Sequence, residues 1–249
     1  MSSAPKAARR LFIAGTDTEI GKTHVACALL RAARQRGQRV AAIKPIAAGA
    51  EPTPDGLRNE DALALLAAAR GLPAGTAFAA EDYAEVNPYC FAAPVSPHIA
   101  AAEAGAEVNL NLIRALADRA AAKNDWLVVE GAGGWFAPLG PELTIADLAG
   151  TLNLPVLLVV GLRLGCLNHA MLSRQAIERS GLKLAGWAVS EIDPTMPRRA
   201  ENLATLRRTF GCEPLLHLGF DPTPAAELEA GTRALKQLGW LSEDQTDSA

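Results

Sequence analysis

The stretch that most constrains this chain is GTDTEIGKTH, which spans residues 15–24 between an apolar run and a helical run. Its spacing, Gly-x-x-x-x-Gly-Lys-Thr, is that of a phosphate-binding loop, in which backbone N–H groups at the start of a helix face the phosphates of a nucleotide. Such a loop has a strand before it and a helix after it. Residues 11–14 predict the strand, and residues 22–36, followed by Gly37, predict the helix. The chain is therefore expected to bind a nucleotide.

The charged residues of this loop raise a question. Lys22 is expected to contact the β- and γ-phosphates, and Thr23 to offer its hydroxyl to Mg²⁺. Two other loop positions, Asp17 and Glu19, are acidic. A carboxylate about 6 Å from a phosphate charge costs about 3 kcal/mol at an effective dielectric near 20. Either a cation offsets this repulsion, or the acids point away from the phosphates.

Short apolar runs alternate with helical stretches along the rest of the chain. Further strands are expected at residues 40–46, 126–129, 155–160 and 184–189, and helices at 61–70, 110–123, 167–179 and 225–238, with an irregular stretch at 87–97. The strands are apolar throughout rather than alternating, which predicts a mostly parallel sheet with helices on both faces. The 249 residues are expected to form a single α/β domain of the P-loop nucleotide hydrolase type, frayed at about residues 1–8 and 243–249.

Charge and apolar content exclude several classes of protein. A net charge of -3 gives no reason to expect nucleic acid or an anionic membrane as a partner. No apolar run approaches the about 20 residues that span a membrane. The four cysteines include no CxxC pair, which disfavours a zinc site and is typical of reduced thiols. We therefore expect a cytoplasmic protein.

Polar residues follow several of the expected strands, at the edge where parallel sheets bind ligands. Lys44 lies near the end of the strand at 40–46, as a site residue or an ordinary surface lysine. Glu130 ends the strand WLVVE, where nucleotide hydrolases carry a metal-binding acid, or it enters a plain turn. Asp61 opens a helix and either binds metal or only stabilises the helix start. Residues 161–169, GLRLGCLNH, predict a second helix N-terminus that accepts an anion.

Six segments together resemble the dethiobiotin synthetase family. They are GTDTEIGKT, IKPIAAG, PDGLRNEDALAL, VNPYCFAAPVSPH, VEGAGGWFAPL and VVGLRLGCLNHAML. Related nucleotide-loop proteins share only the first and parts of the fifth, so the combination is specific. The resemblance implies an ATP- and Mg²⁺-dependent reaction of biotin biosynthesis. In it, 7,8-diaminononanoate takes up CO₂ as an N-carbamate, ATP converts the carbamate to a carbamic-phosphoric anhydride, and ring closure yields dethiobiotin, ADP and phosphate.

The resemblance also implies roles for residues. Thr23, Asp61 and Glu130 would bind Mg²⁺, and Lys44 and Lys22 would be catalytic. The nucleotide would contact Glu19, Ile20, Gly21, Lys22, Thr23, His24, Asp61, Glu130, Gly131, Ala132, Gly133, Ser190, Glu191, Gly219, Phe220 and Asp221. The substrate would contact Thr18, Lys44, Ala48, Cys166, Leu167 and Asn168, and the last three would bind its carboxylate from the other subunit of a homodimer.

The substrate of this family offers an answer to the question of the loop acids. It carries two amines, so an acid near the γ-phosphate has a cationic neighbour. We expect Glu19, with Thr18, to lie near the amine, the nucleotide and the metal. Asp17 either shares this role or turns away and caps the loop locally, and the sequence does not separate the roles of the two acids.

The chain departs from the family at three places. Ala48 stands where members usually carry a hydroxyl residue that touches the substrate. Ser190 and Glu191 stand where they carry Asn-Asp, and one hydroxyl cannot replace the paired donor and acceptor of the Asn amide that reads adenine. The segment HLGFDP, which contains residues 219–221, aligns poorly with the nucleotide loop of the family. The sequence therefore leaves the nucleotide preference open.

The alternative is a nucleotide-driven switch of the partition or nitrogenase-reductase type, which acts on a protein partner. Such proteins usually carry an extra lysine early in the loop, where this chain has Asp17 and Thr18.

Overall fold

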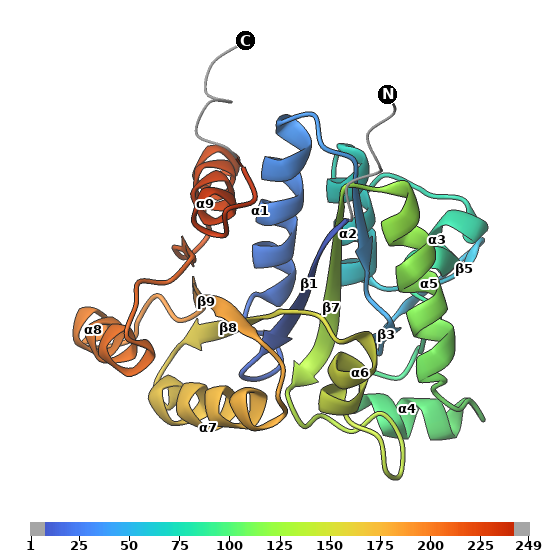
Figure 1. Ribbon diagram of the computed structural model, residues 1–249. Helices are drawn as coiled ribbons and strands as arrows, with labels where there is room; N and C mark the ends of the chain where they lie inside the picture. Colours follow the sequence, from blue (N-terminus) through green and yellow to red (C-terminus); the bar gives the residue numbers. More distant parts are fainter. Residues whose placement is uncertain (1–7, 242–249) are drawn as a thin grey trace.

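A six-stranded sheet runs through the residues that the computed structural model describes, 8–241 (Figure 1). Its strands are β1 (Arg9–Gly15), β2 (Val40–Ile43), β7 (Trp126–Gly134), β8 (Val156–Leu162), β9 (Leu184–Glu191) and β10 (Leu216–Leu218). They lie in the order β10-β9-β8-β1-β7-β2, and every neighbouring pair is parallel. The predicted fold class is confirmed.

Helices cover both faces of this sheet, as the continuous apolar strands predict. One face carries α1 (Lys22–Gln35), α2 (Glu60–Arg70) and α9 (Pro224–Gln237), and the other carries α5 (Leu110–Lys123), α6 (Ile145–Leu152), α7 (Cys166–Arg179) and α8 (Arg199–Phe210). In β1, Leu11 and Ile13 pack on the face that carries α1, α2 and α9, and Phe12 and Ala14 pack on the opposite face. Because both faces are covered, every one of these positions must be apolar.

The predicted strand at 40–46 is wrong in its second half. β2 ends at Ile43, and residues 46–47 form β3 (Ile46–Ala47), which pairs in parallel with β6 (Tyr89–Cys90) in a separate small sheet. The physical reason is Pro45, which has no N–H to donate to a ladder. The Lys44 N–H instead donates to the carbonyl of Val86 at 2.9 Å. The stretch predicted to be irregular thus contains a short strand.

Several short elements have no counterpart in the sequence predictions. They are α3 (Ala80–Val86), α4 (Pro97–Glu103), the hairpin of β4 (Glu51–Thr53) and β5 (Gly56–Arg58), and also α6, α8 and β10. The frayed ends predicted at 1–8 and 243–249 lie outside the described residues, apart from Ala8, which packs against the core. Between residues 8 and 241, no helix combines the length and apolarity needed to cross a membrane.

Candidate active site

The phosphate-binding loop leaves the sheet at the carboxyl end of β1 and enters α1 at Lys22. Gly21 is the N-cap of α1, with a φ of 83°, and contributes no side chain to the cap. A Cβ at Gly21 would lie 2.2 Å from Ser190 Oγ, so only glycine fits between the loop and β9. The N–H groups of the first turn therefore lack a side-chain cap, which is how an anion-binding helix start is built.

Lys22 lies along the inside of this loop. Its ammonium group donates a hydrogen bond to the carbonyl oxygen of Asp17 at 2.7 Å. A Cβ at Gly15 would lie 2.8 Å from Lys22 Cδ, so this glycine makes room for the lysine. Burial, with a smaller contribution from the nearby charge of Lys44, lowers the pKa of Lys22 to about 8.

The two loop acids have different surroundings. Asp17 Oδ1 accepts the Thr18 N–H at 2.8 Å, a bond within the loop itself. Its other oxygen forms an ion pair with Arg163, in the segment after β8. Arg163 was missed by sequence reasoning, because an arginine two residues before a Gly-Cys pair carries no recognisable signal. Glu19 is exposed at the cleft and has a φ of 56°, a conformation rare outside glycine.

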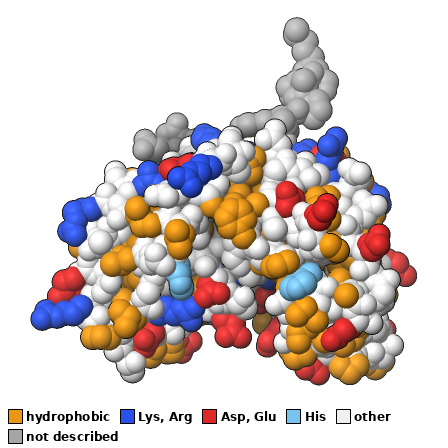
Figure 2. Space-filling view, turned by 90° about the horizontal axis from the view of Figure 1, so that it is seen from below, with side chains coloured by type: hydrophobic (Ala, Val, Ile, Leu, Met, Phe, Trp, Pro, Cys, Tyr) orange, Lys and Arg blue, Asp and Glu red, His pale blue; other side chains and the backbone are white. Residues whose placement is uncertain are grey.

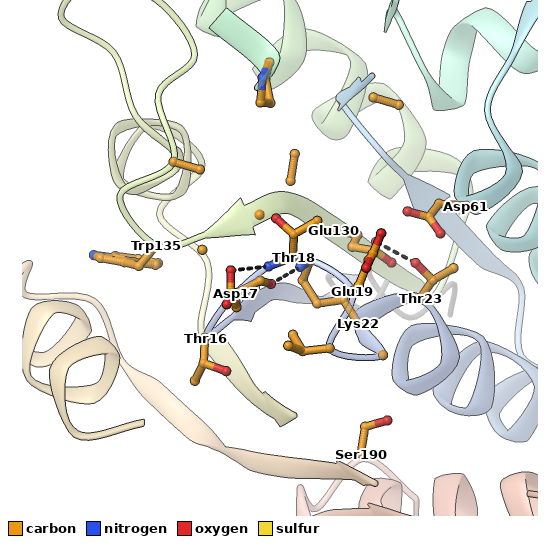
Figure 3. Close-up of a pocket in the computed structure, with 18 of the residues that line it drawn as sticks. Thr16, Asp17, Thr18, Glu19, Lys22, Thr23, Asp61, Glu130, Trp135 and Ser190 are labelled. Carbon is orange, nitrogen blue, oxygen red and sulfur yellow. Dashed lines mark hydrogen bonds between the residues drawn. The ribbon is translucent and has the colours of Figure 1, made fainter. Parts of the chain in front are cut away.

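Lys44, Asp61, Glu130 and Thr23 meet at one point beside the loop. Lys44 Nζ donates to Glu130 Oε1 at 2.5 Å and to Asp61 Oδ2 at 2.8 Å. Thr23 Oγ1 donates to the same Glu130 oxygen at 2.8 Å. Figure 3 shows Thr23, Asp61 and Glu130 facing a common space, with Ser190 on the other side of the loop. The pairing of two strands explains why Lys44 meets Glu130. Ile43 of β2 pairs with Val129 of β7, so the residues that follow them, Lys44 and Glu130, are neighbours.

The contacts around Lys44 are largely shielded from solvent. The side chain of Glu130 is fully buried, and Lys44 is 4% exposed. Burial alone would lower the pKa of Lys44, but the carboxylates of Glu130 and Asp61 outweigh it and hold this pKa above its ordinary value. Burial would likewise raise the pKa of Asp61, and Lys44 outweighs it and keeps that pKa low. Lys44 and Asp61 are therefore held in their charged forms.

The donor set fits Mg²⁺. Two carboxylates and a hydroxyl are the hard oxygen ligands that this ion takes, and it commonly binds through one or two carboxylates together with substrate phosphates. Glu130 Oε2 is buried and has no hydrogen-bond partner among the described residues. Within the same residues no cluster of three or more His, Cys, Asp or Glu could hold a metal by itself. The nucleotide and water would therefore have to complete the coordination.

A cleft of about 1860 Å³ opens from this point and contains most of the predicted site. The predicted residues that line it are Thr18, Glu19, Ile20, Gly21, Lys22, Thr23, His24, Lys44, Ala48, Asp61, Glu130, Ala132, Gly133, Ser190, Glu191, Gly219, Phe220 and Asp221. Gly131 does not line it, because a side chain there would meet Phe12 and Ile145 and thus faces the core.

The carboxylate of Glu191, which lines the cleft at the end of β9, is already engaged. It accepts from Arg199 Nη1 at 2.7 Å and lies 2.9 Å from His217 Nε2. Neither partner was expected, because α8 and β10 were not predicted. Phe220, which also lines the cleft, is 53% exposed and offers it an aromatic surface.

Cys166, Leu167 and Asn168 lie outside the cleft, at the start of α7. Cys166 is buried against the core, and burial raises the pKa of its thiol. Asn168 is exposed. Figure 2 looks onto this face, formed by α4, α6 and α7, and shows many exposed apolar side chains. Among the exposed apolar residues of α7 and the turn before it are Leu164, at 81%, and Leu172, at 59%.

Comparisons with known proteins point to one family. A family model described as an AAA domain matches residues 9–223. ATP-dependent dethiobiotin synthetase BioD 1 of Escherichia coli (strain K12) is 48% identical over 241 residues, which cover 97% of this chain and 95% of that protein. ATP-dependent dethiobiotin synthetase BioD of Aromatoleum aromaticum is 49% identical over 223 residues, covering 88% and 95%.

Solved structures resemble the chain in fold. The MinC:MinD cell division protein complex of Aquifex aeolicus matches with a TM-score of 0.59 at 14% identity, over 94% of this chain and 97% of that one. A ParA family ATPase from Chlorobium tepidum TLS matches with a TM-score of 0.50 at 13% identity, over 93% and 95%. At such identities the likeness shows the fold alone.

Proposed function

The chain belongs to the family of ATP-dependent dethiobiotin synthetases and makes dethiobiotin in biotin biosynthesis, and we propose that it does so in the cleft beside residues 15–24 from 7,8-diaminononanoate, CO₂ and ATP. The observation that carries this proposal is the cluster of Lys44, Asp61, Glu130 and Thr23 at the phosphate-binding loop. The switch-type alternative is weaker, because the chain shares 48% identity with a synthetase and only 14% with the MinC:MinD complex.

The reaction proceeds in three steps. One amine of the substrate attacks the carbon of CO₂ and loses a proton, which gives the N-carbamate. A carbamate oxygen then attacks the γ-phosphorus of ATP, the bond to the bridging oxygen breaks, and ADP leaves. The second amine attacks the carbonyl carbon of the resulting anhydride, phosphate leaves with the electrons of the C–O bond, and loss of a proton completes the ureido ring.

Lys22 and Lys44 supply fixed positive charge for the second step. Two anions approach each other there, so cations held in place stabilise the charge that develops. Both ammonium groups are buried at the loop and are held by hydrogen bonds. Thr23, Asp61 and Glu130 would hold Mg²⁺, which when bound would neutralise charge on the phosphate oxygens.

Glu19 and Thr18 lie near the substrate amines in this proposal. Arg163 already neutralises Asp17, whereas Glu19 is exposed at the mouth of the cleft. A protonated amine beside Glu19 would offset its repulsion from the γ-phosphate. We also propose a cytoplasmic location, which the free state of all four cysteines supports.

The whole proposal is tested by product detection. The purified protein is incubated with the diamine, bicarbonate, ATP and Mg²⁺, with each omitted in turn, and dethiobiotin and ADP are measured by mass spectrometry. We expect both products only in the complete mixture. ADP release that ignores the diamine would instead support the switch.

We propose that Ser190 makes the nucleotide preference shallow. Its side chain is buried against Gly21, so an Asn at this position would have to extend into the cleft. A missing amide pair is worth about 1–3 kcal/mol, or about ten- to a hundredfold in selectivity. Turnover with ATP, GTP and CTP should therefore be similar for the unmodified protein, and Ser190→Asn should favour ATP. Strong ATP selectivity before the substitution would show that other groups read the base.

We propose that the chain acts as a homodimer in which residues 166–168 of one subunit bind the substrate carboxylate in the cleft of the other. Gly165, the N-cap of α7, has a φ of 95° and contributes no side-chain cap, so the first turn of α7 is free to face an anion. The exposed Leu164 and Leu172 supply apolar surface beside it.

Subunit complementation tests this dimer. Asn168→Asp places a like charge beside the substrate carboxylate, and Lys44→Gln disables the phosphoryl-transfer site. If each active site combines residues of two subunits, mixing and refolding the two inactive variants should restore about a quarter of wild-type activity at limiting diamine, since half of the dimers then carry one intact site. Activity that merely sums the two variants would contradict the shared site.

A further inference from the structure

Tyr83, in α3, lies behind the active site at the junction of the two segments that carry Lys44 and Asp61. Its side chain packs in a small cluster between α2 and α3 and is nearly fully buried. Its hydroxyl accepts the Asn59 N–H at 2.7 Å and donates to Asn87 Oδ1 at 2.9 Å. Burial raises the pKa of Tyr83 well above its ordinary value, so the hydroxyl keeps the proton that it donates.

The bond to Asn59 fixes the start of the helix that carries Asp61. Asn59 is the N-cap of α2, and its side chain accepts the Ala62 N–H at 3.3 Å. Asp61 is the second residue of this helix. A shift of the cap would therefore move the Asp61 carboxylate relative to Lys44, which it contacts at 2.8 Å.

The bond to Asn87 fixes the segment that carries Lys44. Asn87 is buried, and its Nδ2 donates to the carbonyl oxygens of Lys44 at 2.7 Å and of Tyr89 at 3.2 Å. The Lys44 N–H is held by the carbonyl of Val86 from the same turn. The N–H and the carbonyl of Lys44, the residue directly after β2, are thus both held by hydrogen bonds to Val86 and Asn87 at the end of α3.

We propose that Tyr83 is a positioning residue that fixes the positions of Lys44 and Asp61 relative to each other. This inference rests on the roles proposed above for those two residues. One hydroxyl joins two chain segments whose side chains meet in the active site. Substrate and nucleotide do not reach it, because the ring lies outside the cleft. Its effect is therefore on the rate of the chemical step rather than on nucleotide affinity.

Tyr83→Phe tests the proposal, because it keeps the ring and removes the hydroxyl. Tyr89→Phe is the matched control, since the Tyr89 hydroxyl likewise accepts a backbone N–H at a helix start, that of Asn109 at 2.8 Å. Misplacement of a catalytic group by about 1 Å costs up to about 10²-fold. We expect Tyr83→Phe to lower kcat about tenfold or more with KM for ATP within about threefold, and Tyr89→Phe to leave kcat unchanged. Equal kcat values for the two variants would overturn the proposal.

A double-mutant cycle shows which groups Tyr83 acts through. In the Lys44→Gln or Asp61→Asn protein, adding Tyr83→Phe should lower kcat much less than it does alone, because coupled residues are not additive. Full additivity in both backgrounds would place the effect of Tyr83 elsewhere and overturn the proposal. Asn87→Leu, which removes the same link from its other end, should reproduce the tenfold loss, so the proposal stays testable if Tyr83→Phe folds poorly.

ADP and dethiobiotin are both measured, so the ratio of the kcat of each variant to the kcat of the unmodified protein can be obtained from either product. Failure of the proposed function would appear as absence of dethiobiotin from the unmodified protein. Failure of the positioning role would appear as an unchanged ratio.

Discussion

Glu130→Gln should lower dethiobiotin formation and ADP release together by about 10³-fold, because one buried carboxylate contacts both Lys44, the lysine proposed to be catalytic, and the hydroxyl proposed to bind Mg²⁺. The amide keeps the shape of the side chain, and its oxygen can still accept from Lys44 and Thr23. The glutamine side chain carries no negative charge. One of the two carboxylate oxygens, either the unpartnered Oε2 or Oε1, is replaced by an NH₂ group, which cannot bind a cation. Turnover should therefore fall while the fold survives.

The measurement is turnover against Mg²⁺ concentration, with far-ultraviolet circular dichroism as the test of folding. Asp61→Asn should show the same combined loss, since Asp61 is the other proposed carboxylate ligand. Glu213→Gln is the matched control. It removes the same charge from an exposed ion pair with Arg207, and neither residue of that pair lines the cleft. Wild-type turnover of both site variants at limiting Mg²⁺ would rule out the proposed metal site.

The parts of the fold that sequence reasoning predicted are those with local signals. α5 runs over the predicted residues 110–123, because Asn109 accepts the N–H groups of Asn111 and Leu112 and so sets its start. The phosphate-binding loop was predictable for a similar reason, since its glycines and lysine stand at fixed spacing. α8 was missed because it buries only Leu203 and Leu206 among many charged residues, which leaves no clear helical periodicity.

The site was predictable residue by residue but not as an arrangement. Lys44 and Glu130 could each be placed at the end of a strand, but their contact depends on β2 lying beside β7, which no local pattern encodes. The same holds for Asp17 and Arg163, 146 positions apart, which meet because β1 lies beside β8. Tyr83 had no signal at all, since its importance comes from two hydrogen bonds to distant segments.

The structure also changes the interpretation of the cations. The sequence analysis assigned a catalytic role to Lys44 and Mg²⁺ binding to Thr23, Asp61 and Glu130, without predicting a contact between the two. In the structure the Lys44 ammonium lies on the two carboxylates that would bind the metal. A metal at this point must therefore share Asp61 and Glu130 with Lys44 or move it toward the phosphates.

Lys44→Gln should consequently separate catalysis from binding. We expect kcat to fall by about 10²–10³-fold, the typical cost of one lost electrostatic contact to a transition state. KM for ATP should change only a few-fold, because Lys22 and the loop N–H groups would still be available to contact the phosphates. Lys183→Gln is the matched control, since it removes an exposed lysine at the opposite end of β9.

The same variant should bind Mg²⁺ better when no nucleotide is present. Removing the ammonium leaves Asp61 and Glu130 without their shared cation, so a divalent ion becomes the group that offsets their mutual repulsion. Mg²⁺ alone should therefore raise the melting temperature of Lys44→Gln more than that of the unmodified protein, as measured by calorimetry over a series of Mg²⁺ concentrations. A near-normal kcat of Lys44→Gln would show that Lys44 does not contribute to the catalytic step. Equal stabilisation of the two proteins by Mg²⁺ would instead show that the ion does not use the oxygens that Lys44 contacts.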